Sequence, residues 1–122
     1  MKQKAPMAEP NTESLCRSKC VPCEGGVPTL DRDAANQFLV ATPQWTIDSE
    51  AKMISRKVSL KNFVQAMDLM NRIGEVAESE GHHPDLHLTG YRNVRIDLTT
   101  HAIGGLSEND FIVAAKIDQL LD

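Results

Sequence analysis

Aromatic residues are scarce in this chain of 122 residues, where one Trp, one Tyr and three Phe make up 4%. So few rings exclude a platform of stacked side chains of the kind that binds single-stranded nucleic acid. A basic excess is missing as well, because 13 Lys and Arg oppose 17 Asp and Glu to give a net charge of −4. We therefore expect no direct nucleic-acid partner.

Long apolar runs are also absent, and none approaches the roughly 18–20 residues that a membrane span needs. The N-terminus, Met1-Lys2-Gln3-Lys4-Ala5-Pro6, lacks the apolar core of a secretory signal. Cysteine is limited to one odd cluster of three, which is not typical of a secreted disulfide framework. We expect no membrane partner and a cytoplasmic location, with an organelle left open for a processed precursor.

The cysteine cluster, Cys16-x-x-x-Cys20-x-x-Cys23, lies in a segment that is poor in large apolar residues. Residues 1–29 contain four prolines and the Gly25-Gly26 pair, so we predict a flexible N-terminal tail. One interpretation of the cluster is a zinc or iron–sulfur knuckle completed by a ligand from another segment. Because no second pair of cysteines balances the first, we favour reduced thiols without a structural role.

Residues 30–122 have the length and patterning of one globular domain. Helical spacing of apolar residues alternates with runs of period two, which indicates the order α-β-β-α-β-β-α. The predicted elements are a helix from Thr29 or Asp31 to about Ala41, strands over 44–47 and 53–59, a long helix up to about Glu80, strands over 85–89 and 93–100, and a last helix opened by a capping box at Ser107-Glu108-Asn109-Asp110. Strands joined by hairpins predict an α+β sandwich, with a four-stranded antiparallel sheet and three helices on one face.

Histidine supplies the candidate chemistry. His82, His83 and His101 fall within twenty residues, and Glu78 precedes His82 by four residues. Imidazole exchanges protons near neutral pH, so a pocket built from these side chains can do acid–base catalysis. The Gly81-His82-His83-Pro84 segment is expected in the turn between helix and strand, and His101 just past a strand end. We expect these histidines at the surface, where substitution by alanine costs within about 1 kcal/mol of stability.

Metal binding is the competing interpretation, because His and Glu side chains ligate zinc and iron. The spacing does not match a His-Glu-x-x-His helix, nor a recognisable arrangement of two histidines and one carboxylate. Adjacent histidines rarely hold one ion through both rings without backbone strain. We therefore expect no metal and no cofactor, with solvated surface histidines as the remaining alternative.

The pattern Glu78-x-x-x-His82-His83-Pro84, six residues, Tyr91, nine residues, His101, eight residues and Asp110 resembles the signature of the pterin-4a-carbinolamine dehydratases. That family is also known as the dimerisation cofactor of a homeodomain transcription factor. The resemblance spans about residues 30–120 and implies a sandwich of four antiparallel strands with three helices on one face. It further implies dehydration of 4a-hydroxytetrahydrobiopterin to quinonoid dihydropterin, which recycles the pterin cofactor of aromatic amino-acid hydroxylases.

The resemblance also implies roles for particular residues. His82, His83 and His101 would be the acid–base groups, with Glu78 as a partner that orients or charges one of them. The pterin would contact two short segments, whose residues are Gly81, His82, His83, Thr99, Thr100, His101 and Ala102. Family members form dimers and tetramers, so a homodimer or homotetramer is expected. The alternative function is a protein-interaction module, a transcriptional dimerisation cofactor that acts through its helical surface.

Overall fold

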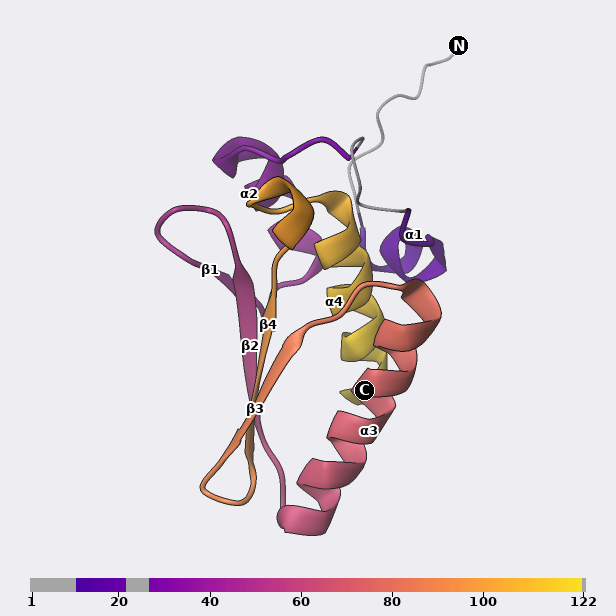
Figure 1. Ribbon diagram of the computed structural model, residues 1–122, viewed down its shortest axis with the longest axis vertical. Coiled ribbons are helices and arrows are strands. Elements are labelled where there is room, and N and C mark those ends of the chain that lie inside the picture. Colours follow the sequence, from indigo (N-terminus) through magenta and orange to yellow (C-terminus); the bar gives the residue numbers. More distant parts are fainter. Residues whose placement is uncertain (1–10, 22–26, 122) are drawn as a thin grey trace.

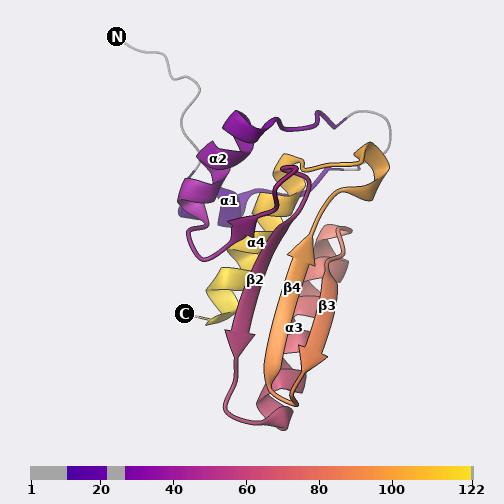
Figure 2. The same cartoon turned by 90° about the vertical axis from the view of Figure 1, so that its left-hand side faces the viewer.

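A computed structural model gives the fold of residues 11–21 and 27–121 (Figure 1). A single layer of helices covers one face of a β-sheet, and the opposite face of the sheet carries no described helix (Figure 2). The elements in chain order are α1 (Thr12–Arg17), α2 (Arg32–Ala41), β1 (Thr46–Ile47), β2 (Ile54–Ser59), α3 (Phe63–Glu80), β3 (Asp85–Thr89), β4 (Asn93–Leu98), the 3₁₀ turn η1 (His101–Ile103) and α4 (Glu108–Leu121). None of the helices in this part of the chain is long and apolar enough to cross a bilayer.

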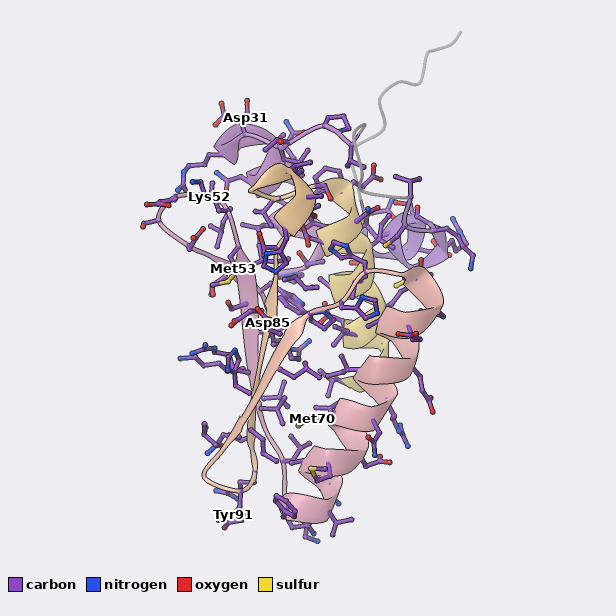
Figure 3. The ribbon with its side chains drawn as sticks, viewed as in Figure 1. Asp31, Lys52, Met53, Met70, Asp85 and Tyr91 are labelled. Atoms are coloured by element: carbon purple, nitrogen blue, oxygen red, sulfur yellow. The ribbon has the colours of Figure 1, made fainter. Side chains whose placement is uncertain are left out.

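The four strands form one antiparallel sheet in the order β1-β2-β4-β3, which confirms the predicted fold class. Successive side chains along each strand point alternately to the two faces of the sheet. Val94, Ile96 and Leu98 of β4 are buried under the helices, whereas Arg95 points to the open face. The β3–β4 hairpin ends at Tyr91, which lies at the tip farthest from α2 (Figure 3).

Helix α3 is held at both ends by local signals in the sequence. The Asn62 side chain caps its first turn by accepting from the Gln65 N–H at 2.8 Å. Gly81 ends it in the left-handed conformation, at φ +66°, which glycine adopts without steric cost. Its buried side chains recur at helical spacing and face the core: Ala66, Leu69, Ile73 and Ala77.

Helix α4 is the central helix of the fold, with contacts to α1, α2 and α3. Its middle is buried on every side, from Phe111 through Ala115, and Ile117 continues the buried face. Phe111 stacks on Phe38 of α2, with ring centroids 5.1 Å apart. Because α4 has so little freedom to shift, side chains on its first turn have fixed positions.

The first strand is shorter than predicted. Residues 44 and 45 precede β1 rather than belonging to it, because the Trp45 side chain is buried against the helix layer. Its indole N–H donates to Asp118 Oδ1 of α4 at 2.9 Å, and the same carboxylate pairs with Arg56 of β2. The turn before β1 is therefore tied to both layers.

The N-terminal segment differs from the expected tail. Residues 12–17 form α1, which the Asn11 side chain caps at Ser14 and which packs on α4. Leu15 is 2% exposed and belongs to the main core. Composition failed to predict this packing because one Leu and two half-buried cysteines, Cys16 and Cys20, supply the apolar contact. Residues 1–10 and 22–26, which include Cys23, lie outside the described residues.

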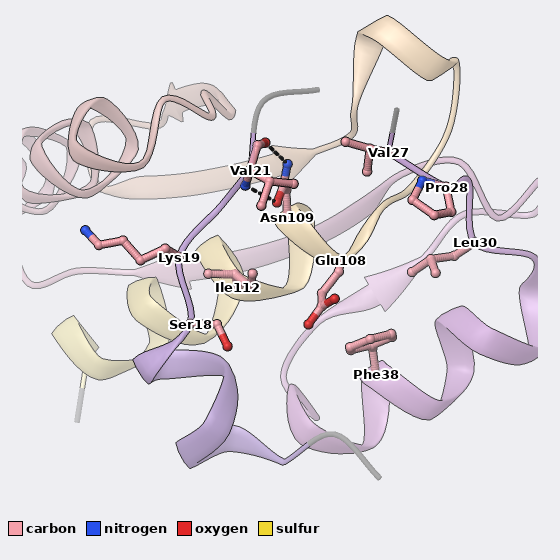
Figure 4. Close-up of a pocket in the computed structure, with 10 residues that line it drawn as sticks. All are labelled: Ser18, Lys19, Val21, Val27, Pro28, Leu30, Phe38, Glu108, Asn109 and Ile112. Atoms are coloured by element: carbon pink, nitrogen blue, oxygen red, sulfur yellow. Dashed lines mark hydrogen bonds between the residues drawn. The ribbon is translucent and has the colours of Figure 1, made fainter. Parts of the chain in front are cut away.

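The end of the N-terminal segment is held by hydrogen bonds to residues at the C-terminus of α3 and at the N-terminus of α4. The Asn109 side chain pairs with the Val21 backbone through two hydrogen bonds of 3.1 and 2.8 Å (Figure 4). The buried carboxylate of Glu80 accepts from the Cys20 N–H at 2.9 Å and from Lys116 Nζ at 2.8 Å. A pocket of about 350 Å³ lies beside these contacts, and none of the predicted site residues lines it (Figure 4).

Glu80 makes the stability of this anchor dependent on pH. Burial alone would raise the pKa of Glu80, but hydrogen bonds from Lys116 and the Cys20 backbone, with the charges of Lys116 and Lys19, lower it below its ordinary value. A lowered carboxylate pKa gives stability above the unfolded-state value of about 4.3, which is lost as the pH falls through the lower folded-state value.

We therefore expect wild-type protein to lose more unfolding free energy than Glu80→Gln between about pH 6 and pH 3. Urea unfolding across this range measures the difference. Glu75→Gln, which removes an exposed carboxylate of the same helix, is the matched control and is expected to follow wild type. Parallel profiles for wild type and Glu80→Gln would contradict the assignment.

Candidate active site

The ends of three elements meet at the predicted histidines. His82 and His83 follow the Gly81 cap of α3 and precede β3, as the sequence predicted. Thr99 and Thr100 follow β4 and lead into η1, which begins at His101. The first turn of α4 completes the region, because Asp110 on that turn reaches both His82 and Thr100.

His82 and Asp110 form a buried pair. His82 is 5% exposed, and its Nε2 lies 2.6 Å from Asp110 Oδ1. The other oxygen, Oδ2, accepts from Thr100 Oγ1 at 2.8 Å and from the Ser107 N–H at 3.0 Å. A carboxylate that accepts three hydrogen bonds holds the proton of the imidazole on Nε2, so the tautomer and the ring plane of His82 are both fixed.

The predicted capping box explains why Asp110 is in place. Its carboxylate accepts from the Ser107 backbone N–H, the return contact of such a box. The Ser107 hydroxyl does not complete the box by capping and lies 2.8 Å from Thr100 Oγ1. One carboxylate therefore caps α4, anchors the strand end through Thr100 and orients His82.

His83 and His101 have the opposite environment, because both are exposed. His83 Nε2 lies 2.9 Å from Glu78 Oε1 on the last turn of α3, and both side chains are largely in water. His101 opens the η1 turn, which a backbone bridge between Thr100 and Gly105 closes. The expectation that all of these histidines lie at the surface is therefore wrong for His82.

Seven predicted substrate-contact residues line one open pocket of about 220 Å³. Its walls are the helix-to-strand turn and the strand-to-η1 turn: Gly81, His82, His83, Thr99, Thr100, His101 and Ala102. Glu78 is not in the lining and reaches the pocket through His83. Thr99 is held at the rim because its hydroxyl donates to the Lys52 carbonyl at 2.5 Å.

Asp110 is the residue that sequence reasoning left out of the candidate site. In the sequence it was recognised only as a capping residue and as one position of the signature, whereas the structure places its Oδ1 2.6 Å from His82 Nε2. The capping box was a usable signal, because it fixes Asp110 on the first turn of α4. What the sequence lacked was the distance between that turn and the end of α3.

This arrangement can move protons. One imidazole is oriented by a buried carboxylate, and two more approach the same pocket from separate turns of the chain, with contact to solvent. Groups on two sides of a ligand can protonate one atom and deprotonate another, which is the requirement for eliminating water. Thr99 and Thr100 and the backbone of both turns provide polar contacts for orientation.

Comparison with known proteins gives a consistent result. The profile of the family described as pterin 4 alpha carbinolamine dehydratase matches residues 28–120. A protein of Halorhodospira halophila, provisionally named as such a dehydratase, is 50% identical over 107 residues, covering 88% of this chain and 97% of the relative. The mitochondrial pterin-4-alpha-carbinolamine dehydratase 2 of Arabidopsis thaliana is 44% identical over 109 residues, which are 87% of this chain and 58% of that protein.

A solved structure supports the fold. The crystal structure of a transcriptional coactivator/pterin dehydratase from Brucella melitensis superposes with a TM-score of 0.72 at 27% identity, covering 78% of this chain and all of that chain. Both the predicted family and its enzyme class, a hydro-lyase, are confirmed by these matches. The chain belongs to the pterin 4 alpha carbinolamine dehydratase family.

Proposed function

We propose that the protein dehydrates 4a-hydroxytetrahydrobiopterin, a pterin-4a-carbinolamine, to quinonoid dihydropterin and water by general acid–base catalysis, and so recycles a pterin cofactor. The observation that carries the proposal is the pocket in which His82, His83 and His101 come together. The family and the names of the relatives support the same reaction. The reaction needs no redox cofactor, since no electrons leave the substrate.

The chemistry requires two proton transfers. An acid protonates the hydroxyl on the ring carbon, the lone pair of the adjacent ring nitrogen forms a C=N double bond, and water departs. A base then removes the proton from that nitrogen. Each transfer assisted by a positioned imidazole contributes about 10²–10⁴-fold to the rate.

The environments of the histidines suggest a division of work. His83 and His101 are exposed, so they can exchange protons with both substrate and solvent. Glu78 Oε1 lies 2.9 Å from His83 Nε2, so this carboxylate can orient the imidazole. His82 forms the rigid wall of the pocket, and its fixed orientation under Asp110 lets it bind one defined edge of the pterin. Gly81, Thr99, Thr100 and Ala102 would contact the ring around them.

Enzyme assay tests the proposal directly. Purified full-length protein is expected to accelerate conversion of 4a-hydroxytetrahydrobiopterin to the quinonoid product, followed by ultraviolet absorbance, above the uncatalysed rate. Circular dichroism on the same sample establishes that the protein is folded. Folded protein without any acceleration would contradict the proposed function.

Other expectations stay predictions. Phe63, Val64 and Met67 are exposed on the first turns of α3, and exposed apolar patches mark interaction surfaces, but they specify no partner for the alternative interaction module. The homodimer or homotetramer and the cytoplasmic location likewise belong to the proposal. The mitochondrial name of the Arabidopsis relative is compatible with the organellar alternative.

A further inference from the structure

The open face of the sheet carries a row of three basic side chains. Lys57 of β2 pairs in register with Arg95 of β4, and Arg95 pairs in register with His87 of β3. Directly opposed side chains on one face of a sheet have Cβ atoms about 5 Å apart, and like charges in such pairs are destabilising. In a chain of net charge −4, this row is not a consequence of overall composition.

Asp97 offsets only part of this charge. It is 6% exposed, and its carboxylate lies 2.9 Å from His87 Nε2 and 3.2 Å from an Arg95 guanidinium nitrogen. The Ser55 hydroxyl donates to it at 2.6 Å. Burial alone would raise the pKa of Asp97, but the hydrogen bonds and the Arg95 charge lower it, so the carboxylate is ionised at neutral pH.

Lys57 is not compensated in this way, since it makes no ion pair with any described residue. Asp97 thus fixes the positions of Arg95 and His87 and neutralises the charge of Arg95. The ammonium group of Lys57 stays exposed to solvent.

The three basic residues line a pocket of about 320 Å³ on this face. The next row of the sheet adds neutral hydrogen-bonding groups from Ser59, Asn93 and Thr89, which also line the pocket. None of the lining residues is acidic, and none is shared with the histidine pocket. The volume is at the lower end for pockets that bind small molecules.

We propose that this pocket binds a small ligand through a phosphate group. Donors come from three adjacent strands, so they approach a ligand from separate directions. A tetrahedral group with three terminal oxygens can accept from all of them, whereas a planar carboxylate is satisfied by one guanidinium fork. Arg, Lys and hydroxyl side chains are the ordinary ligands of phosphate.

Nuclear magnetic resonance on the full-length protein tests the proposal, with inorganic phosphate and methyl phosphate as probes at constant ionic strength. We expect saturable shifts of backbone amides around Lys57, His87 and Arg95 for both probes, with acetate binding at least about tenfold more weakly. Methyl phosphate binding more tightly than the free ion would assign the site to phosphate esters, and the reverse order to inorganic phosphate. Shifts that do not saturate, that favour acetate, or that map to the histidine pocket would overturn it.

Variants that each remove one positive charge distinguish a specific phosphate site from a general electrostatic attraction of anions to the protein surface. Arg95→Gln and Lys57→Gln are each expected to raise the dissociation constant for phosphate about tenfold, the effect of losing one charge-assisted hydrogen bond. Lys52→Gln removes the same charge at the β1–β2 connection, at the other end of β2 (Figure 3), and is expected to leave it within twofold. If Arg95→Gln does not fold, Lys57→Gln still decides, because no ion pair with a described residue is lost. Equal weakening by Lys52→Gln would overturn the proposal.

Discussion

Replacing His101 with alanine is expected to lower the rate constant for carbinolamine dehydration by about 10²–10⁴-fold, the usual contribution of a positioned acid or base. The reason is its place on the strand-to-η1 turn, across the pocket from the helix-to-strand turn that carries His82 and His83. Because the side chain is exposed, the unfolding free energy is expected to stay within about 1 kcal/mol of wild type. Stopped-flow absorbance and urea unfolding measure the two quantities.

Two further variants make this result interpretable. Gln37→Ala removes an exposed side chain of similar size from α2, far along the chain from the pocket, and is expected to change neither rate nor stability. His101→Gln keeps a hydrogen-bonding side chain that cannot take up a proton near neutral pH. If His101→Gln retains the wild-type rate, His101 only orients the substrate and the acid–base role is wrong.

Most of the fold could be predicted because local signals and tertiary contacts agree. The Asn62 cap, the Gly81 stop and the spacing of Ala66, Leu69 and Ile73 specify α3 without knowledge of its neighbours. Alternation in β4 likewise identifies the buried face of the sheet. The exception is α1, whose contact with the core is made by Leu15 and the half-buried Cys16 and cannot be recognised until α4 is in place.

The candidate site could be predicted only in part from the sequence. The spacing of the three histidines in the sequence identified them as candidate site residues, but it gave no information on which of them is buried. That depends on the tertiary placement of Asp110 beside the end of α3, a separation of 28 residues along the chain. The small stability effect expected for His82→Ala therefore does not hold, because the substitution would leave a buried carboxylate one hydrogen bond short. For His101→Ala, which removes an exposed side chain, we still expect a stability cost within about 1 kcal/mol.

Replacing Asp110 with asparagine is expected to lower the unfolding free energy by about 3 kcal/mol, since three donors lose their carboxyl acceptor in a buried site. The amide NH₂ would also face one of these donors. The dehydration rate should fall as well, because His82 is no longer held in one tautomer and orientation. Glu108→Gln, an exposed carboxylate of the same helical turn, is the control and is expected to cost under about 1 kcal/mol.

A double-mutant cycle decides whether Asp110 acts through His82. Urea unfolding of Asp110→Asn, His82→Gln and the double variant should give a coupling energy above about 1 kcal/mol, as expected for residues in direct contact. The same cycle measured on the dehydration rate should show that His82→Gln removes most of the effect of Asp110→Asn. Additive losses in both measurements would mean that Asp110 serves only to cap α4 and to hold Thr100, and that His82 needs no carboxylate for its part in the reaction.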